Sequence, residues 1–200
     1  MDIENICVFG DSITWGAYDP ENGGWVTILR NYLEPEEMHI YNCGVLSDDT
    51  RALLKRFKTE AVSRSPQLIV FAIGINDSQY TESRDNSRVP TEEFTENIEK
   101  LVSSAGEIAE KIIFIGLTRV DENKTIPVQW SDRDKNYDNT NIGHYDSLIK
   151  QACDKHGLLF LEVSEVLTND DLEDGLHPNP DGHQKLFEKV RDSLDNKGLI

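Results

Sequence analysis

The chain has 200 residues and is 38% hydrophobic, which is enough for one domain, residues 1–200, with one buried core. Its formal net charge of −17, with no basic stripe to offset it, argues against nucleic acid or an anionic membrane surface as a partner. No apolar run approaches the roughly 20 residues of a membrane span, and the acidic N-terminal segment is unlike a targeting sequence. We therefore expect a cytoplasmic protein without membrane insertion.

Short apolar runs alternate along the chain with segments whose apolar residues recur at helical spacing. The runs cover residues 6–9, 38–43, 68–73, 112–117 and 158–161, and the helical segments cover residues 25–33, 53–57, 94–108, 142–157 and 186–194. Thr91, followed by two glutamates, is expected to cap the third helix. This alternation predicts a three-layer α/β/α sandwich with a five-stranded parallel sheet, for which we choose the flavodoxin-like strand order 2-1-3-4-5.

A long polar stretch from Thr118 to Asn141 has no clear period, and such loops are usually lids, binding loops or disorder. Its apolar cluster consists of Trp130, Pro127 and Val128. Because the stretch leaves the carboxyl end of the fourth predicted strand, where ligands bind in such sheets, we expect it to overhang the acyl pocket, with Trp130 as part of a pocket wall that holds an acyl or aryl group. A solvated loop with an incidental tryptophan is the alternative.

The three cysteines, Cys7, Cys43 and Cys153, lie in apolar segments and lack the C-x-x-C spacing of a zinc or redox site. We expect reduced, buried thiols, and neither a metal nor another cofactor. The composition does not indicate an oligomeric state.

Small polar turns follow the first three predicted strands. In the chosen strand order these strands are neighbours, so Ser12, Gly44 and Asn76 emerge at one carboxyl edge. A serine hydroxyl becomes a good nucleophile when a general base lies within hydrogen-bond reach and a third group orients that base. Asp174 and His177 can supply both groups from one loop, because a single turn places residues three positions apart side by side.

Acyl transfer also needs hydrogen-bond donors directed at the developing oxyanion. The candidates are the backbone N–H groups of Ser12 and Gly44 and the side-chain amide of Asn76. Asp11 and Asp77, adjacent in sequence to Ser12 and Asn76, are expected to line the substrate pocket. Each turn has an ordinary alternative, since these residue types are common at strand ends. The other histidines, His39, His144, His156 and His183, have no adjacent carboxylate in a comparable turn and are interpreted as ordinary surface residues.

Four segments, in this order, resemble the sequence blocks of the SGNH, or GDSL-type, esterase and lipase family: Phe9-Gly10-Asp11-Ser12, Asn42-Cys43-Gly44, Gly74-Ile75-Asn76-Asp77 and Asp174-Gly175-Leu176-His177-Pro178. The resemblance implies that Ser12 is the nucleophile, that Gly44 and Asn76 complete the oxyanion hole, and that Asp174 and His177 are the acid and base. It also implies the same five-stranded sandwich. Ile13 departs from the leucine in the family's name, a conservative change.

The predicted function is hydrolysis of carboxylic esters, with a small-molecule ester as the partner and short-chain acyl or aryl esters favoured. The alternatives within the family are a carbohydrate deacetylase and an acyl-thioesterase, and outside catalysis a binding protein for acyl or sugar groups. A phosphoacceptor receiver domain is disfavoured because the first strand is followed by a single aspartate, Asp11, and the fifth by Val163-Ser164-Glu165 without a lysine. A flavin-binding module would need a hydroxyl-rich or glycine-rich loop after the first strand, for which Thr14-Trp15-Gly16-Ala17 is a poor substitute. A metallophosphoesterase would need histidines in the first and third of the four segments, and this chain has none there.

Overall fold

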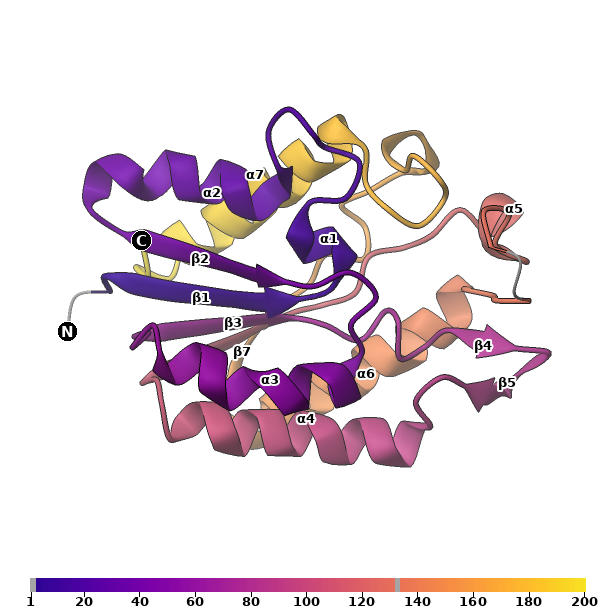
Figure 1. Ribbon diagram of the computed structural model, residues 1–200, viewed down its shortest axis with the longest axis horizontal. Coiled ribbons are helices and arrows are strands. Elements are labelled where there is room, and N and C mark those ends of the chain that lie inside the picture. The colour runs from indigo at the N-terminus through magenta and orange to yellow at the C-terminus, as the bar shows by residue number, and fades with distance from the viewer. Residues whose placement is uncertain (1–2, 132–133) are drawn as a thin grey trace.

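The computed structural model describes residues 3–131 and 134–200. Its main sheet has five parallel strands in the order β2-β1-β3-β6-β7 (Figure 1), which confirms the predicted order 2-1-3-4-5. These strands are β1 (Asn5–Gly10), β2 (His39–Gly44), β3 (Leu68–Ala72), β6 (Lys111–Ile115) and β7 (Leu159–Leu161). The carboxyl ends of β2, β1 and β3 are therefore adjacent.

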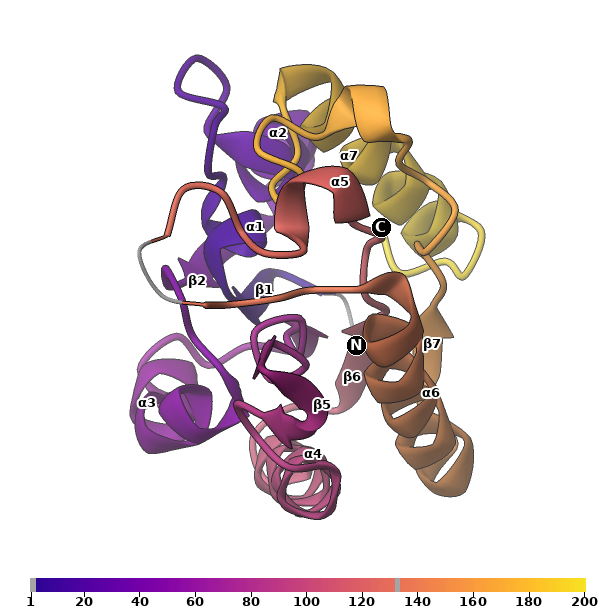
Figure 2. The same ribbon diagram turned by 90° about the vertical axis from the view of Figure 1, so that its right-hand side faces the viewer.

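Helices cover both faces of the sheet, α2 and α7 on one face and α3, α4 and α6 on the other (Figures 1 and 2). The helices are α1 (Ser12–Trp15), α2 (Gly24–Leu33), α3 (Thr50–Val62), α4 (Thr91–Gly106), α5 (Glu122–Thr125), α6 (Asn139–His156) and α7 (Pro180–Asp195), with short 3₁₀ turns η1 (Glu34–Glu36) and η2 (Asn169–Asp171). Within the described residues, no helix is long and apolar enough to cross a membrane.

The central strands are apolar because both of their faces are covered. Phe9 on β1 and Phe71 on β3 are fully buried, and Phe71 packs against Phe57 of α3 and Phe114 of β6 with ring centroids 5.2 and 4.9 Å apart. The buried side chains form one continuous cluster. This packing holds β1 and β3 rigidly, so the turns at their carboxyl ends have fixed positions.

The structure differs from the sequence prediction at the start of α4 and in two polar stretches. Pro90 occupies the N-cap of α4 and Thr91 is the first helical residue, so Thr91 is not the cap. A small hairpin, β4 (Tyr80–Thr81) with β5 (Ser83–Ser87), precedes α4, and α5 lies within the stretch 118–141. Both elements are too short and too polar to show a hydrophobic period.

Candidate active site

The predicted nucleophile and base meet at the carboxyl end of β1. Ser12 is the first residue of α1, and the Asp11 carboxylate caps this helix by accepting a hydrogen bond from the backbone N–H of Ile13 at 2.9 Å. Ser12 Oγ lies 2.9 Å from His177 Nε2, and His177 Nδ1 lies 2.8 Å from Asp174 Oδ2. Three side chains that the sequence separates by up to 165 positions thus form one chain of hydrogen bonds.

The loop that carries Asp174 and His177 is held by its own backbone. Asp174 Oδ1 accepts hydrogen bonds from the N–H groups of Leu176 and His177, at 3.0 and 2.9 Å, and the N–H of Glu173 donates to the carbonyl of His177. Burial acts to raise the pKa of Asp174, but its hydrogen bond to His177, the charge of that imidazole and the two backbone donors outweigh burial, so the pKa is lowered. The ionised carboxylate can therefore orient the His177 ring and stabilise its cation.

Asn76 lies at the end of β3 with its amide fixed on both sides. Its Nδ2 donates to the carbonyl of Asp48 at 2.9 Å, and its Oδ1 accepts a hydrogen bond from the hydroxyl of Tyr137 at 2.9 Å. The Tyr137 hydroxyl also lies 3.2 Å from Gln79 Oε1, and its single hydrogen is assigned to the shorter contact. The second hydrogen on Asn76 Nδ2 has no acceptor among the described residues, so it is available to an oxyanion.

The structure contradicts the prediction for Gly44. Its N–H donates to Asn42 Oδ1 at 2.9 Å and is therefore not a free donor. A glycine is needed here for another reason: a Cβ at this position would lie 2.3 Å from the backbone nitrogen of Trp15, so α1 could not approach β2. Three residues further on, the N–H of Ser47 has no acceptor among the described residues, and Ser47 has a φ of 62° in the turn that leads to Asp48.

Asp77 and Asp11 are buried and occupy different surroundings. Asp77 is fully buried and accepts hydrogen bonds from the N–H and hydroxyl of Thr50, so it lies beneath the site and not on a pocket wall. Burial raises its pKa to about 7, although the bonds from Thr50 act in the opposite direction. Burial likewise raises the pKa of Asp11 to about 6.

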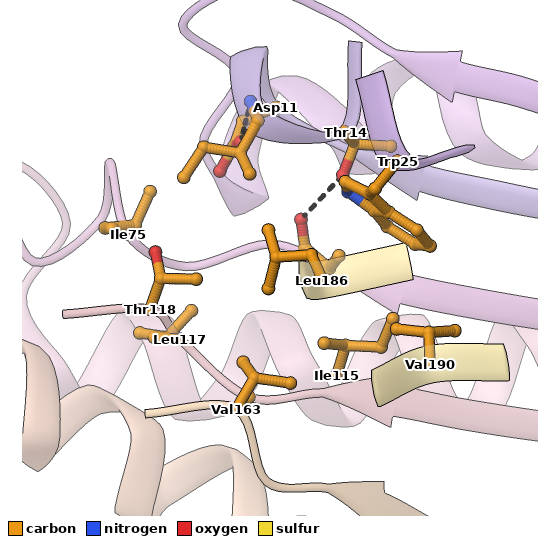
Figure 3. A pocket seen from close by; sticks show the side chains of 13 residues that line it. Asp11, Thr14, Trp25, Ile75, Ile115, Leu117, Thr118, Val163, Leu186 and Val190 are labelled. Carbon is orange, nitrogen blue, oxygen red and sulfur yellow. Dashed lines mark hydrogen bonds between the residues drawn. The ribbon is translucent and has the colours of Figure 1, made fainter. Parts of the chain in front are cut away.

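Asp11 lines a small, mainly apolar cavity beneath α1 (Figure 3). The cavity also contains Thr118, whose buried Oγ1 has no partner among the described residues, and apolar side chains from β6 and α7, including Ile115, Leu186 and Val190. Asp11 thus lines this cavity, and its place in the substrate pocket stays a prediction, whereas the prediction for Asp77 is wrong because its side chain is buried against Thr50.

Two exposed aromatic side chains flank the His177 imidazole. The ring centroids of Tyr18 and Trp130 lie 5.5 and 5.9 Å from that of His177. Trp130 was expected at the site from its place in the 118–141 stretch. Tyr18 and Tyr137 were not predicted at the site, because both lie in polar segments without a hydrophobic period.

The remaining candidates for metal or base chemistry have structural positions. The prediction that His183 is a surface residue is wrong: it is fully buried, its Nε2 lies 2.8 Å from the carbonyl of Ala17, and burial lowers its pKa. His156 pairs with Glu99 on the surface. Cys7, Cys43 and Cys153 are free and buried. Within the described residues no group of histidine, cysteine, aspartate or glutamate side chains could hold a metal ion.

The chain thus combines an α/β/α sandwich of this strand order with a serine, a histidine and an aspartate joined by hydrogen bonds at its carboxyl edge, an arrangement typical of serine hydrolases. The chain matches the model of the GDSL-like lipase/acylhydrolase family over residues 8–185, and it belongs to this family. Its predicted membership of the GDSL-type family and its predicted class, an enzyme that hydrolyses carboxylic esters, are thereby confirmed.

Similar proteins include several named as esterases. The isoamyl acetate-hydrolyzing esterase 1 homolog of Rattus norvegicus is 25% identical, with 96% of this chain and 82% of its own length covered. The arylesterase of Vibrio mimicus is 24% identical, with 96% and 88% covered. Among solved structures, the lipase/acylhydrolase from Enterococcus faecalis has a TM-score of 0.80 at 23% identity, covering 97% of this chain and 96% of its own. An acetylxylan esterase from Geobacillus stearothermophilus has a TM-score of 0.74 at 20% identity, covering 96% and 94%.

Proposed function

We propose that this protein hydrolyses short-chain acyl or aryl esters through an acyl-enzyme on Ser12. The observation that carries the proposal is the continuous chain of hydrogen bonds from Ser12 through His177 to Asp174. Such a chain gives the hydroxyl a base and gives the base an orienting carboxylate, which are the two requirements for an activated serine.

In the first half of the reaction, Ser12 Oγ attacks the carbonyl carbon of the ester while His177 Nε2 takes the hydroxyl proton. The tetrahedral intermediate then collapses, the bond to the alcohol oxygen breaks, and His177 returns the proton to that oxygen. In the second half, His177 takes a proton from water, which attacks the acyl carbon. The carboxylic acid leaves, and the proton returns to Ser12 Oγ.

Three donors stabilise the oxyanion in this proposal: the N–H of Ser12, the second amide hydrogen of Asn76 and the N–H of Ser47. The N–H of Ser12, like that of Ser47, has no acceptor among the described residues. Ser47 replaces the predicted Gly44, and it stands next to Asp48, whose carbonyl holds the Asn76 amide. Tyr137 is a positioning residue, because its hydroxyl fixes the Asn76 oxygen and so directs the amide nitrogen.

The names of the relatives support ester substrates of modest size, since they include a homolog of an isoamyl acetate-hydrolyzing esterase and an arylesterase. The acetylxylan esterase among the structural neighbours supports only the fold, and deacetylation of a carbohydrate stays an alternative within the same mechanism.

Two measurements test the proposal. A fluorophosphonate should label Ser12 alone, and a panel of p-nitrophenyl esters of rising chain length should be cleaved best at the short end. Labelling that survives in Ser12→Ala, or a clean preparation that cleaves none of these esters, contradicts the serine mechanism. A preference for long acyl chains contradicts only the short-chain assignment.

A further inference from the structure

Tyr18 and Trp130 are large aromatic side chains that remain exposed beside the proposed base. Their exposed fractions are 48% and 47%, whereas the His177 side chain between them is 12% exposed. The two rings come from segments 112 positions apart, and both make the same 44° angle with the imidazole. Two independent loops thus bring apolar faces to one point of the site.

Both rings are carried by anchored backbone. Ala17, which precedes Tyr18, has its carbonyl 2.8 Å from the buried His183 Nε2, and the following Asp19 carboxylate accepts hydrogen bonds from the N–H groups of Asn22 and Gly24. Near Trp130, the buried Val128 donates its N–H to the carbonyl of Lys135 at 2.8 Å. Tyrosine and tryptophan side chains have few rotatable bonds, so on an anchored backbone they bind the flat face of a ligand at a low cost in conformational entropy.

The mechanism determines which part of an ester meets these rings. His177 Nε2 takes the proton from Ser12 and must deliver it to the leaving oxygen, so this oxygen lies within hydrogen-bond distance of the imidazole. The atoms bonded to that oxygen belong to the alcohol, and they come next to His177 and hence next to Tyr18 and Trp130. The carbonyl oxygen points to the oxyanion donors, and the acyl group takes the remaining substituent position on the carbonyl carbon, away from the leaving oxygen.

We propose that Tyr18 and Trp130 form the binding site for the alcohol part of the ester, and that this alcohol is an uncharged ring with an apolar face, aryl or pyranose. Such rings stack on exposed aromatic side chains, whereas a short aliphatic alcohol covers little of them. The net charge of −17 and the adjacent Asp174 carboxylate disfavour an anionic alcohol. The inference rests on the proposed acyl-enzyme mechanism and adds the substrate class.

The ring and the hydroxyl of Tyr18 have separate roles that substitution can distinguish. Partial burial, followed by the charge of the neighbouring Asp174 carboxylate, raises the pKa of the Tyr18 hydroxyl. Tyr18→Phe keeps the ring and loses the hydroxyl, so it should keep the preference for ring alcohols. Tyr18→Ala loses both.

The experiment holds the acyl group constant as acetyl and varies the alcohol: phenyl acetate, an acetylated methyl pyranoside and ethyl acetate. Rapid-mixing kinetics give the acylation and deacylation rates of wild type, Tyr18→Ala, Tyr18→Phe and Trp130→Ala. Tyr32→Ala is the control, because Tyr32 is similarly exposed, at 52%, but packs on Phe187 of α7. Fluorophosphonate labelling of Ser12 confirms that each variant is folded.

We expect acylation by the ring acetates to fall roughly tenfold in both alanine variants. Acylation by ethyl acetate should change about twofold or less, and deacylation should not change, because the alcohol has left before water attacks. If only one ring acetate is affected, that ring is the natural alcohol. The inference is overturned if acylation by ethyl acetate falls as much as acylation by the ring acetates, or if deacylation falls as much as acylation. His177 acts in both steps, so aromatic rings that only support His177 would slow both. A wild-type protein without Ser12 labelling instead overturns the proposed function.

Discussion

Replacing Tyr137 with phenylalanine tests how the Asn76 amide is held. The variant removes one buried hydroxyl and leaves Asn76 Oδ1 without the donor that lies 2.9 Å away. Loss of a partner from a buried polar group costs about 1–3 kcal/mol of stability. Removal of an oxyanion donor itself costs roughly 100- to 1000-fold in kcat. Because the amide remains present but can rotate, we expect a smaller loss, about 10- to 100-fold in kcat, with little change in KM.

The chain offers a matched control in Tyr145. This residue is also fully buried, and its hydroxyl donates to the carbonyl of Val89 instead of to Asn76. Tyr145→Phe should lose a similar free energy of unfolding, measured by urea denaturation, and keep its kcat. A purely structural role for Tyr137 predicts the same behaviour in both variants.

A double-mutant cycle with Asn76→Ala provides the decisive measurement. If Tyr137 acts through Asn76, adding Tyr137→Phe to Asn76→Ala should lower kcat no further. An undiminished effect of Tyr137→Phe in that background, or equal kcat values for the two phenylalanine variants, refutes the positioning role.

Three further predictions concern the site and the carboxylates around it. Ser12→Ala should lower kcat by about 10⁴ or more while circular dichroism stays unchanged; retention of a tenth of wild-type turnover is incompatible with a serine nucleophile. Asp174→Asn should lower kcat by about 10⁴ with little change in melting temperature, because the imidazole loses its orienting acceptor; wild-type turnover in this variant means that His177 needs no carboxylate. The pKa of Asp77 is about 7 in the folded chain and 3.8 in the unfolded chain, so between these pH values only the folded chain holds the proton. The free energy of unfolding of the wild type should therefore fall as pH rises from about 4 to about 7. Asp77→Asn has no such proton to lose. Its free energy of unfolding minus that of the wild type, from urea denaturation, should therefore be higher at pH 7.5 than at pH 4.5 by up to roughly 3 kcal/mol. A difference that does not change with pH contradicts the raised pKa of Asp77.

The sequence by itself determined the sheet and the candidate catalytic side chains. Continuous apolar runs such as residues 68–73 are typical of strands buried on both faces, and their alternation with helical periods leaves few strand orders open. This order places Ser12 and Asn76 at one edge. The three-residue spacing of Asp174 and His177 is local, so a single turn decides their contact, and the structure has them 2.8 Å apart.

Only the tertiary structure decided which donors are free and which side chains surround His177. The N–H of Gly44 is not free to bind an oxyanion because it donates to the Asn42 side chain. The orientation of the Asn76 amide depends on the hydroxyl of Tyr137, 61 positions away. Tyr18 and Trp130 reach His177 from polar segments that have no hydrophobic period. Strand order follows from burial, which leaves a periodic pattern in the sequence, whereas single hydrogen bonds and ring contacts between loops depend on packing and leave none.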